Sequence, residues 1–268
     1  MTAIPPLLLI GCGRMGSAML AGWRERGLAA SYAVDPAPDA ARNAGADLTV
    51  VGDLGSVPAG FAPAAVVLAV KPQNAAEALP VCARYAGSAV FLSIMAGRTI
   101  AGIQDLLGGN TAIVRAMPNT PAAVRQGITV ATPSPSVTAA QRALCGDLLS
   151  AIGLVEWVEQ ESLLDPVTAV SGSGPAYVFL LAELMERAAI EQGIAPDLAR
   201  VLARQTVAGS GALLAASPES AADLRKAVTS PGGTTQAALE VLMAPDRLPA
   251  AFSEAIAAAA RRSRELAG

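Results

Sequence analysis

Short, unbroken apolar runs alternate with longer mixed segments through the first part of the chain. Six runs have the length of strands and occupy residues 7–10, 32–34, 48–51, 65–70, 89–94 and 112–115. Because the runs are continuously apolar, they predict strands that are buried on both faces, as in a parallel sheet. Residues 128–131 and 154–158 would extend that sheet. The segments between the runs are long enough for crossover helices, so the pattern predicts an α/β fold with a doubly wound Rossmann domain.

The pattern changes after about residue 161, where the strand-like runs stop. Helices are expected at 176–191, after Pro196, after a cap at Ser217, after the break at 231–233, and at 249–266. Proline suits the first turn of a helix, and a serine just before a helix caps its first N–H groups. The 268 residues therefore divide into a sheet domain at 1–161 and an all-helical region at 162–268.

Several of the expected helices are apolar nearly all round, as between residues 201 and 216. An isolated helical region of that composition would expose large apolar faces to water. Burial against a second copy of the chain is the simplest way to cover them, so we expect a homodimer. The alternative is that the first domain covers the same faces.

Composition narrows the function classes. The chain is 53% hydrophobic and 15% charged, which excludes intrinsic disorder. A net charge of -3 and a pI near 5.1 argue against a nucleic-acid surface, since phosphate binding needs clustered basic groups. The apolar runs stay short of the roughly 18 residues that a membrane span needs, so no membrane segment is expected.

The chain has no histidine and three cysteines, Cys12, Cys82 and Cys145. The lack of histidine removes most zinc sites, the Ser-His and Cys-His nucleophile pairs, and imidazole as a general acid. The cysteines are odd in number and far apart, so we expect neither a metal site nor a disulfide framework. This usage fits a reducing cytoplasm, and the first residues lack the basic region of a signal peptide.

A glycine-rich sequence follows the first apolar run and precedes a helix that is expected to start at Ser17. It fits the pattern G-x-G-x-x-G and consists of Gly11, Cys12, Gly13, Arg14, Met15 and Gly16. Between a strand and a helix, the glycines let the backbone approach a dinucleotide pyrophosphate, which the helix N-terminus binds through its N–H groups. The context favours a cofactor site over an ordinary tight turn, and makes 1–161 a dinucleotide-binding domain.

Asp35 ends the second apolar run, about 20 residues beyond the glycines. In such domains an acidic residue at this place binds the adenine ribose hydroxyls, and it would repel the 2′-phosphate of NADP. Asp35 therefore favours NADH, although the nearby Arg42 would offset its charge. Aspartate before a proline is also a common turn residue, and the sequence leaves both roles open.

Ligands of a doubly wound sheet bind beyond the carboxyl ends of its strands. Three sets of residues lie there and are candidates for cofactor contacts: Ala69, Val70, Lys71 and Pro72, then Met95, Ala96 and Gly97, and finally Asn119. The chain has only two lysines, Lys71 and Lys226. A lysine at a strand end in so arginine-rich a chain points to a need for the compact ammonium group. A solvated loop lysine and a structural turn at Asn119 are the alternatives.

A second glycine-rich segment, residues 229–235, precedes an apolar helix in the helical region. Glycines followed by hydroxyl groups at a helix start make a site for a carboxylate or a phosphate, and a simple capped turn is the alternative. Residues 171–175 also alternate serine and glycine, but they lack the glycine that a nucleophile elbow needs two residues before its serine. We expect close helix packing there.

These segments occur together in one family. In order along the chain they are Gly-Cys-Gly-Arg-Met-Gly at 11–16, Ala-Val-Lys-Pro-Gln at 69–73, Arg-Ala-Met-Pro-Asn-Thr at 115–120, Val-Thr-Ala-Val-Ser-Gly-Ser-Gly-Pro-Ala-Tyr at 167–177 and Val-Thr-Ser-Pro-Gly-Gly-Thr-Thr at 228–235. The chain resembles pyrroline-5-carboxylate reductase along nearly its whole length. Many dehydrogenases share the first motif, whereas the last two are much more specific.

The resemblance implies reduction of 1-pyrroline-5-carboxylate to L-proline by NADPH or NADH, the last step of proline synthesis. It also implies a Rossmann domain, a helical domain that dimerises, and assembly of dimers into larger rings in many members. Members that prefer NADPH carry small or basic residues after the second strand, and Asp35 departs from that pattern.

Site residues also follow from the resemblance. The substrate carboxylate would be bound by the loop that contains Ser230, Gly233, Thr234 and Thr235. Thr235 would lie near the ring nitrogen, Glu161 near the substrate and Lys71 by the nicotinamide. The catalytic candidates are therefore Thr235 and Lys71.

Two other interpretations stay open at this point. A β-hydroxyacid dehydrogenase, or an imine reductase with another substrate, would share the Rossmann start and the helical dimer. The hydroxyacid class needs a catalytic lysine in its second domain, for which Lys226 is the only candidate. A non-catalytic dinucleotide sensor would not need the loop at 230–235. An assay with pyrroline-5-carboxylate and each cofactor separates these interpretations.

Overall fold

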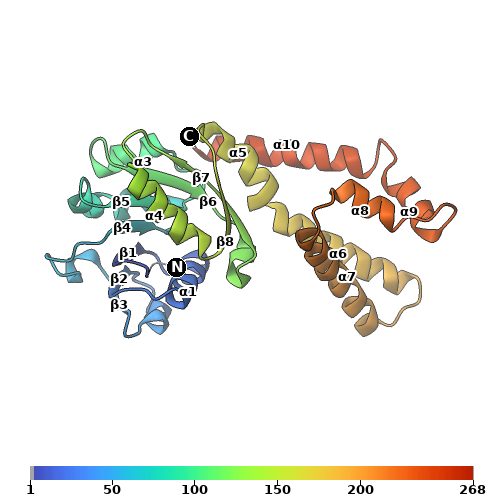
Figure 1. The fold of residues 1–268 in the computed structure, drawn as a ribbon, viewed down its shortest axis with the longest axis horizontal. Helices are drawn as coiled ribbons and strands as arrows, with labels where there is room; N and C mark the ends of the chain where they lie inside the picture. Colours follow the sequence, from blue (N-terminus) through green and yellow to red (C-terminus); the bar gives the residue numbers. More distant parts are fainter. Residues whose placement is uncertain (1–2, 268) are drawn as a thin grey trace. The chain divides into compact units, whose positions relative to one another are not determined.

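A computed structural model describes residues 3–267. Its sheet has eight strands: β1 (Leu7–Ile10), β2 (Ser31–Val34), β3 (Leu48–Val51), β4 (Ala65–Leu68), β5 (Val90–Ser93), β6 (Ile113–Met117), β7 (Gly127–Pro133) and β8 (Gly153–Trp157). The strand order is β3-β2-β1-β4-β5-β6-β7-β8 (Figure 1). The order reverses between β1 and β4, and a doubly wound sheet binds its ligand at such a point. The predicted fold class and all eight predicted strands are confirmed.

One strand pair departs from the prediction of a parallel sheet. β6 and β7 are antiparallel, with Arg115 opposite Thr132 and Met117 opposite Val130. The connection between them holds only the 3-10 turn η5 (Thr120–Val124), which ends at Arg125 in the left-handed conformation. A connection this short joins antiparallel neighbours, because a parallel pair needs a crossover of a dozen or more residues.

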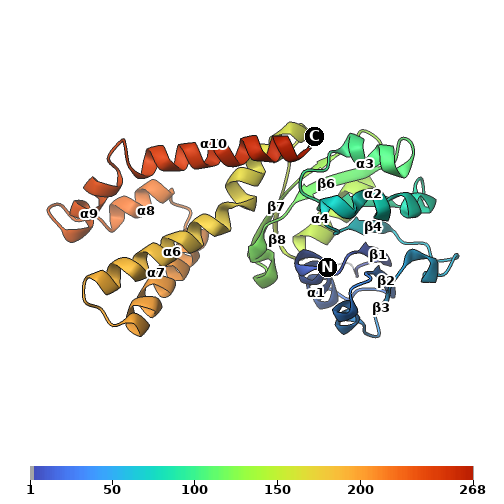
Figure 2. The ribbon, with the colours of Figure 1, turned by 180° about the vertical axis from the view of Figure 1, so that it is seen from behind.

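Apolar clusters cover both faces of the sheet. Helices α1 (Arg14–Glu25) and α4 (Ala139–Ser150) pack on one face, and α2 (Ala75–Ala78) and α3 (Ile100–Leu107) on the other (Figure 2). Trp23 of α1 is 1% exposed, and its indole N–H donates to the carbonyl of Leu148 in α4 at 2.9 Å. Strands β1, β4 and β5 are buried along their whole length, which explains their unbroken apolar sequences.

The remaining connections in this part of the chain are short 3-10 turns in place of the expected crossover helices. They are η1 (Pro38–Asn43), η2 (Leu54–Ser56), η3 (Pro72–Asn74) and η4 (Pro80–Tyr85). Past β8, the chain passes through η6 (Glu161–Leu163), α5 (Leu164–Val167) and a π-helical turn, η7 (Thr168–Gly172). The serine and glycine residues at 171–175 therefore lie where one helical segment changes into the next.

The later part of the chain is helical, as predicted. It contains α6 (Gly174–Glu191), α7 (Pro196–Ala216), α8 (Ala221–Ala227), α9 (Thr234–Leu242) and α10 (Leu248–Ala267). The predicted cap at Ser217 is wrong by one turn: Ser220 caps α8 by accepting from the Asp223 N–H, whereas Ser217 accepts from the Glu219 N–H in the turn before it. Hydroxyl-bearing residues on both sides of Pro218 offer the same chemistry, and the local turn selects the second.

Contacts divide the chain into two units: residues 1–172 with 259–268, and residues 173–258. We call them the sheet unit and the helical unit. Their boundary differs from the predicted one between 161 and 162, because α5 packs against β6 and β7 and the end of α10 belongs to the sheet unit. The first two residues and the last residue of the predicted ranges lie outside the described part.

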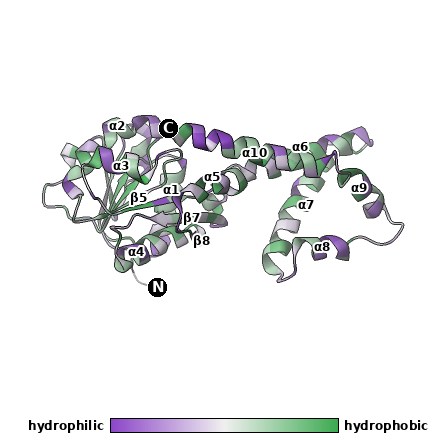
Figure 3. Ribbon diagram, turned by 90° about the horizontal axis from the view of Figure 1, so that it is seen from above, coloured by the Kyte–Doolittle hydropathy of each residue, from purple (hydrophilic) through white to green (hydrophobic). Residues whose placement is uncertain are grey.

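The helical unit buries little of its own apolar surface. Within its described residues only Ala199 and Ala203 are buried apolar side chains, while Phe179 is 66% and Val201 61% exposed. Figure 3 shows hydrophobic residues along α6 and α7. By length and composition, the helical stretch Glu161–Glu191 is even long and apolar enough to cross a membrane, since an 18-residue window within it has a mean hydropathy of 1.3. The sequence analysis expected no membrane segment because it considered only unbroken runs of apolar residues. A helix that packs against a second subunit has the same apolar composition as a membrane-spanning one.

Candidate active site

The glycine-rich loop joins β1 to α1 at the point where the strand order reverses. Gly11 has φ +99°, and a Cβ there would stand 2.8 Å from the Ala69 carbonyl oxygen. A Cβ on Gly16 would collide with the Gly11 carbonyl. No side chain caps α1 at Gly13, and its first turn has no acidic residue. The N–H groups of Gly11 and Cys12 are already bonded, to the Val34 carbonyl and to Asp35. The open N–H groups are those of residues 13–16, at the start of α1, and they suit a diphosphate.

Asp35 is fixed by two backbone groups. One carboxylate oxygen accepts from the Cys12 N–H at 2.6 Å, and the other accepts from the Ala37 N–H at 2.9 Å. The second bond is the turn that the sequence left open as an alternative, and the first ties the end of β2 to the glycine loop. Arg42 does not offset this charge directly, because its guanidinium pairs with Asp39 at 3.1 Å. The carboxylate keeps lone pairs for a further donor.

The loop after β4 carries Lys71, which is exposed and whose side-chain nitrogen has no hydrogen-bond or ion-pair partner within residues 3–267. The loop after β5 carries Met95, which is 1% exposed as a whole residue and lies in the core, so its predicted cofactor contact stays a prediction. Arg98 joins the two loops, since its Nε and Nη2 donate to the Pro72 carbonyl at 3.1 and 2.9 Å. Sequence reasoning missed Arg98, because no motif or spacing relates it to Pro72.

A pocket of about 700 Å³ opens beside these loops in the sheet unit. Ile10, Val34 and Pro36 line it from the ends of β1 and β2, and Val70 from the end of β4. The acidic residues Asp53 and Glu77 also line it, and the guanidinium of Arg84 there bonds the carbonyls of Leu54 and Val57. The pocket wall is thus apolar, and its rim is acidic. The sequence did not reveal this pocket, because its lining residues come from four separate segments.

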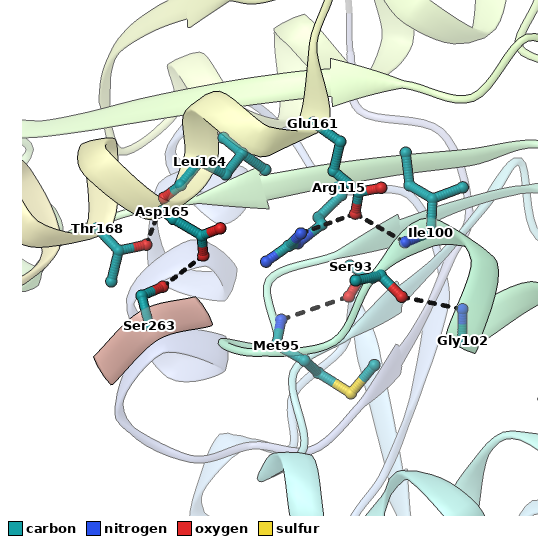
Figure 4. A network of polar contacts seen from close by, with 11 residues as sticks. Ser93, Met95, Ile100, Gly102, Arg115, Glu161, Leu164, Asp165, Thr168 and Ser263 are labelled. Carbon is teal, nitrogen blue, oxygen red and sulfur yellow. Dashed lines mark hydrogen bonds and ion pairs between the residues drawn. The ribbon is translucent and has the colours of Figure 1, made fainter. Parts of the chain in front are cut away.

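Figure 4 shows a buried charge pair next to the loop after β5. Arg115 of β6 has a side chain only 4% exposed, and its Nη1 donates to Glu161 Oε1 at 2.7 Å. The same oxygen accepts from the Ile100 N–H at 2.8 Å, at the first residue of α3. Glu161 therefore neutralises a buried guanidinium and caps a helix, and its predicted substrate contact stays a prediction. Arg115 Nε and Nη2 have no hydrogen-bond partner within the described chain.

Asn119 is held inside the sheet unit by both ends of its amide. Its oxygen accepts from the Ile128 N–H at 3.0 Å, and its nitrogen donates to the Ser171 carbonyl at 3.2 Å. These bonds correspond to the structural turn that the sequence offered as the alternative. A contact with the nicotinamide stays a prediction, and one amide hydrogen is left for it.

The three cysteines are buried thiols of the sheet unit. Burial raises the pKa of Cys12 to about 11, with a further contribution from the charge of Asp35. Burial also raises the pKa of Cys82 and of Cys145 to about 12. None is a thiolate near neutral pH, so none has the reactivity of a catalytic cysteine. Within residues 3–267 no three His, Cys, Asp or Glu side chains gather as a metal site would need.

The predicted carboxylate loop lies in the helical unit, at the start of α9. Gly232 is left-handed at φ +69°, its N–H donates to Gln236 Oε1 at 2.7 Å, and the Gly233 N–H donates to the Ser230 carbonyl at 3.0 Å. No side chain caps α9 at Gly233. The half-buried Thr235 has a hydroxyl without a partner within the described residues. The helix start is therefore free to bind an anion.

Comparison with known proteins places the chain in a family. A model for pyrroline-5-carboxylate reductase dimerisation matches residues 161–266, and a model for coenzyme F420-dependent NADP oxidoreductases matches residues 7–97. The pyrroline-5-carboxylate reductase of Pseudomonas aeruginosa is 38% identical over 269 residues, covering 98% of this chain and 97% of the relative. This chain belongs to the pyrroline-5-carboxylate reductase family. The reductase thus has an NAD(P)-binding domain and a helical dimerisation region, and the predicted family, fold and enzyme class are confirmed.

Solved structures agree with this assignment of the reductase. The pyrroline-5-carboxylate reductase of Coxiella burnetii superposes with a TM-score of 0.89 at 32% identity, over 99% of both chains. The Plasmodium falciparum enzyme, solved with NADP bound, gives a TM-score of 0.84 at 26% identity over 100% of both chains. The matched dimerisation region implies a homodimer. Lys226, the residue a hydroxyacid dehydrogenase would need, is instead an exposed side chain paired with Asp223 at 3.0 Å.

Proposed function

We propose that this reductase transfers a hydride from NAD(P)H to the C=N bond of 1-pyrroline-5-carboxylate and so forms L-proline. The observation that carries the proposal is the open set of N–H groups of residues 13–16, within the glycine loop Gly11–Gly16, in a chain that matches a curated reductase over 98% of its length. These N–H groups supply a place for the dinucleotide, and the full-length match supplies the substrate class.

The cofactor supplies the hydride, and the sheet unit supplies its site. We assign the diphosphate to residues 11–16 and the adenosine half to the pocket lined by Val34, Pro36 and Val70. We assign Asp35, whose carboxylate is fixed by the Cys12 and Ala37 N–H groups, to a ribose hydroxyl. We assign the nicotinamide end to residues 69–72, residues 95–97 and Asn119, with the free amine of Lys71 on that side.

The substrate carboxylate is assigned to the start of α9. Ser230, Gly233, Thr234 and Thr235 surround backbone N–H groups with positive partial charge, which favours an anion. The unpartnered hydroxyl of Thr235 is assigned to the ring nitrogen. Glu161 is assigned near the substrate by family resemblance only, because its Oε1 is already engaged.

The chemistry needs no histidine. A protonated cyclic imine is already electrophilic at carbon, so the protein mainly has to hold that carbon about 3–3.5 Å from the hydride. The Thr235 hydroxyl orients the nitrogen, and the loop N–H groups hold the carboxylate. Such positioning supplies the larger share of the rate, which explains why a chain without imidazole serves as the catalyst.

We also propose that the homodimers assemble into a larger ring in the cytoplasm. The family resemblance supports the ring. The three unpaired cysteines support a reducing compartment such as the cytoplasm.

The test is a spectrophotometric assay with pyrroline-5-carboxylate and each cofactor. Thr235→Ala should lower kcat by about a hundredfold, as removal of one transition-state hydrogen bond does, while the Kd of NADH stays unchanged. Thr229→Ala is the matched control, because that hydroxyl is already bonded to the Arg225 carbonyl at 2.7 Å. Binding of NADH without turnover in the unaltered chain would point to a dinucleotide sensor. A Thr235→Ala loss confined to NADH binding would remove the substrate assignment.

A further inference from the structure

The loop after β5 is fastened at both ends. Arg98 holds its far end to the Pro72 carbonyl, and Glu161 accepts from the N–H of Ile100, the residue that follows the loop. The side chain of Met95 anchors the near end in the core. Ala96 and Gly97 lie between these fixed points.

Gly97 is blocked from one side by the C-terminal helix. It has φ +70°, and a Cβ there would stand 2.9 Å from the carbonyl oxygen of Leu266 and 3.3 Å from its Cβ. Leu266 lies in the last part of α10, which belongs to the sheet unit. Backbone therefore meets backbone at this point, and neither partner yields by a simple rotation of a side chain.

The end of α10 is itself anchored. The hydroxyl of Ser263 donates to Asp165 Oδ1 at 2.7 Å, and Ser263 is 8% exposed (Figure 4). Ala260, one turn earlier, is also 8% exposed. Asp165 lies on α5, close in sequence to Glu161, which braces the same loop through Ile100. The helix end and the loop are thus attached to one short segment, 161–165.

We propose that the end of α10, residues 259–266, is a positioning element for the nicotinamide end of the cofactor, acting as a backstop behind Gly97. The proposal rests on the proposed function, which assigns residues 95–97 to the nicotinamide. A loop fixed at both ends and supported in the middle holds its ligand in one place, and hydride transfer is sensitive to displacements of about 1 Å. Gly97 and Leu266 are positioning residues in this scheme.

The test compares two glycines with the same backbone conformation. Gly87 has φ +85°, and a Cβ added there would meet nothing within 4 Å, whereas Gly97 at φ +70° faces Leu266. Alanine at either position pays the left-handed strain, but only Gly97→Ala pushes against α10. We expect Gly97→Ala to lower kcat by between about tenfold and a hundredfold and to raise the Kd of NADH. Gly87→Ala should leave both within about twofold, as a substitution in open space does.

Binding of ADP-ribose, which lacks the nicotinamide, separates this proposal from the proposed function. Both variants should bind ADP-ribose as the unaltered chain does, by calorimetry. If the unaltered chain binds neither ADP-ribose nor NADH, the dinucleotide site itself is wrong. If Gly97→Ala loses ADP-ribose as well as NADH, or loses neither binding nor turnover, the backstop is wrong and the dinucleotide site stands.

A shortened chain that ends at Glu265 gives the decisive arm. With Leu266 absent, Gly97→Ala should cost no more turnover than Gly87→Ala costs in the full chain. An equal loss in both backgrounds would mean that strain at residue 97 alone explains the effect, and would overturn the proposal. If the shortened chain fails to fold, Ser263→Ala replaces it, because loss of this hydroxyl loosens the end of α10. The losses of turnover in Ser263→Ala and Gly97→Ala should then be less than additive in the double variant. Fully additive losses would count against the backstop.

Discussion

The two units of this reductase differ in how much of their apolar surface is buried within the single chain. In the sheet unit, Leu8 and Phe91 are 0% exposed, and clusters of such residues cover both faces of the sheet. In the helical unit, Phe179 is 66% and Val201 61% exposed, and within its described residues only Ala199 and Ala203 are buried apolar side chains. The first unit completes its own core. The second unit leaves most of its apolar side chains exposed in the single chain, and the second subunit of the dimer covers them.

The difference in burial carries a difference in what stabilises each unit. A core closed within one chain has a free energy of unfolding that does not depend on protein concentration, whereas a core shared by two chains gains stability as concentration rises. The sheet unit also contains the whole proposed site for the dinucleotide. Its adenosine-binding function should therefore outlast the loss of the dimer.

The largest effect is expected from a charge placed on the open helical face. Phe179→Asp puts a carboxylate where a second subunit would bury it, at a cost of several kcal/mol. The dimer should dissociate, and the helical CD signal should fall at micromolar concentration while the affinity for ADP-ribose persists. Sedimentation and calorimetry check both parts. Val124→Asp, at a side chain 69% exposed in the sheet unit, is the control and should leave a dimer.

The second-largest effect is expected from a cavity made in the core of the sheet unit. Phe91→Ala removes a ring that is 0% exposed, and should lower the free energy of unfolding by about 3–5 kcal/mol. The loss should be the same at low and high protein concentration if measured on the Phe179→Asp background. Denaturant titration monitored by tryptophan fluorescence gives the value. A loss that shrinks with rising concentration would mean that the sheet unit too depends on the partner.

Cofactor preference is a smaller effect confined to the sheet unit. Asp35→Asn keeps an acceptor for one of the two N–H groups and removes the charge, so it should raise the ratio of kcat/KM for NADPH over NADH by about tenfold, or 1.4 kcal/mol. Asp53→Asn, at the rim of the pocket that Pro36 lines, should change the ratio less. Adenosine 2′,5′-bisphosphate should show the same gain in affinity. An unchanged ratio in Asp35→Asn would leave Asp35 as a turn residue only.

The smallest effect concerns the three cysteines, which should not react with thiol reagents in the native protein. All three cysteines lie in the sheet unit with pKa values raised to about 11 or 12 by burial, above the roughly 8.5 of a free thiol. At pH 8 they stay protonated in the native state, so a thiol reagent should label the protein only when the sheet unit opens. Phe179→Asp should leave the labelling rate low, and Phe91→Ala should raise it. Rapid labelling of the unaltered protein would show that this core is not closed.

The strands were predictable because burial on both faces leaves a local trace, an unbroken apolar run such as the one in β4. The antiparallel pairing of β6 with β7 left no such trace, since the direction of a strand follows from the length of its connection. The sequence offered Asn119 as a nicotinamide contact or as part of a structural turn, and in the structure its amide ties that turn together.

A candidate site could be proposed from the sequence where its motif is contiguous. Gly11–Gly16 needs no distant partner to be recognised, and Asp35 was placed by its spacing from it. Arg98 and Arg115 were not predictable, because each acts on a residue far away in the sequence, Pro72 and Glu161 respectively. The contact between Gly97 and Leu266 was hidden for the same reason: helical periodicity shows which face of α10 is apolar, and says nothing of where the helix ends in space.

The return of α10 has a consequence for biosynthesis. Because residues 259–266 belong to the sheet unit, the helical unit is an insertion within it, and the sheet unit is complete only after the helical unit has been synthesised. Domains form from the N-terminus during translation, so residues 3–172 fold first with one segment missing. The loop at Gly97 receives its support only after the helices that recruit a second subunit have been made. A nascent chain therefore completes the loop at Gly97 and its dimer surface at nearly the same moment.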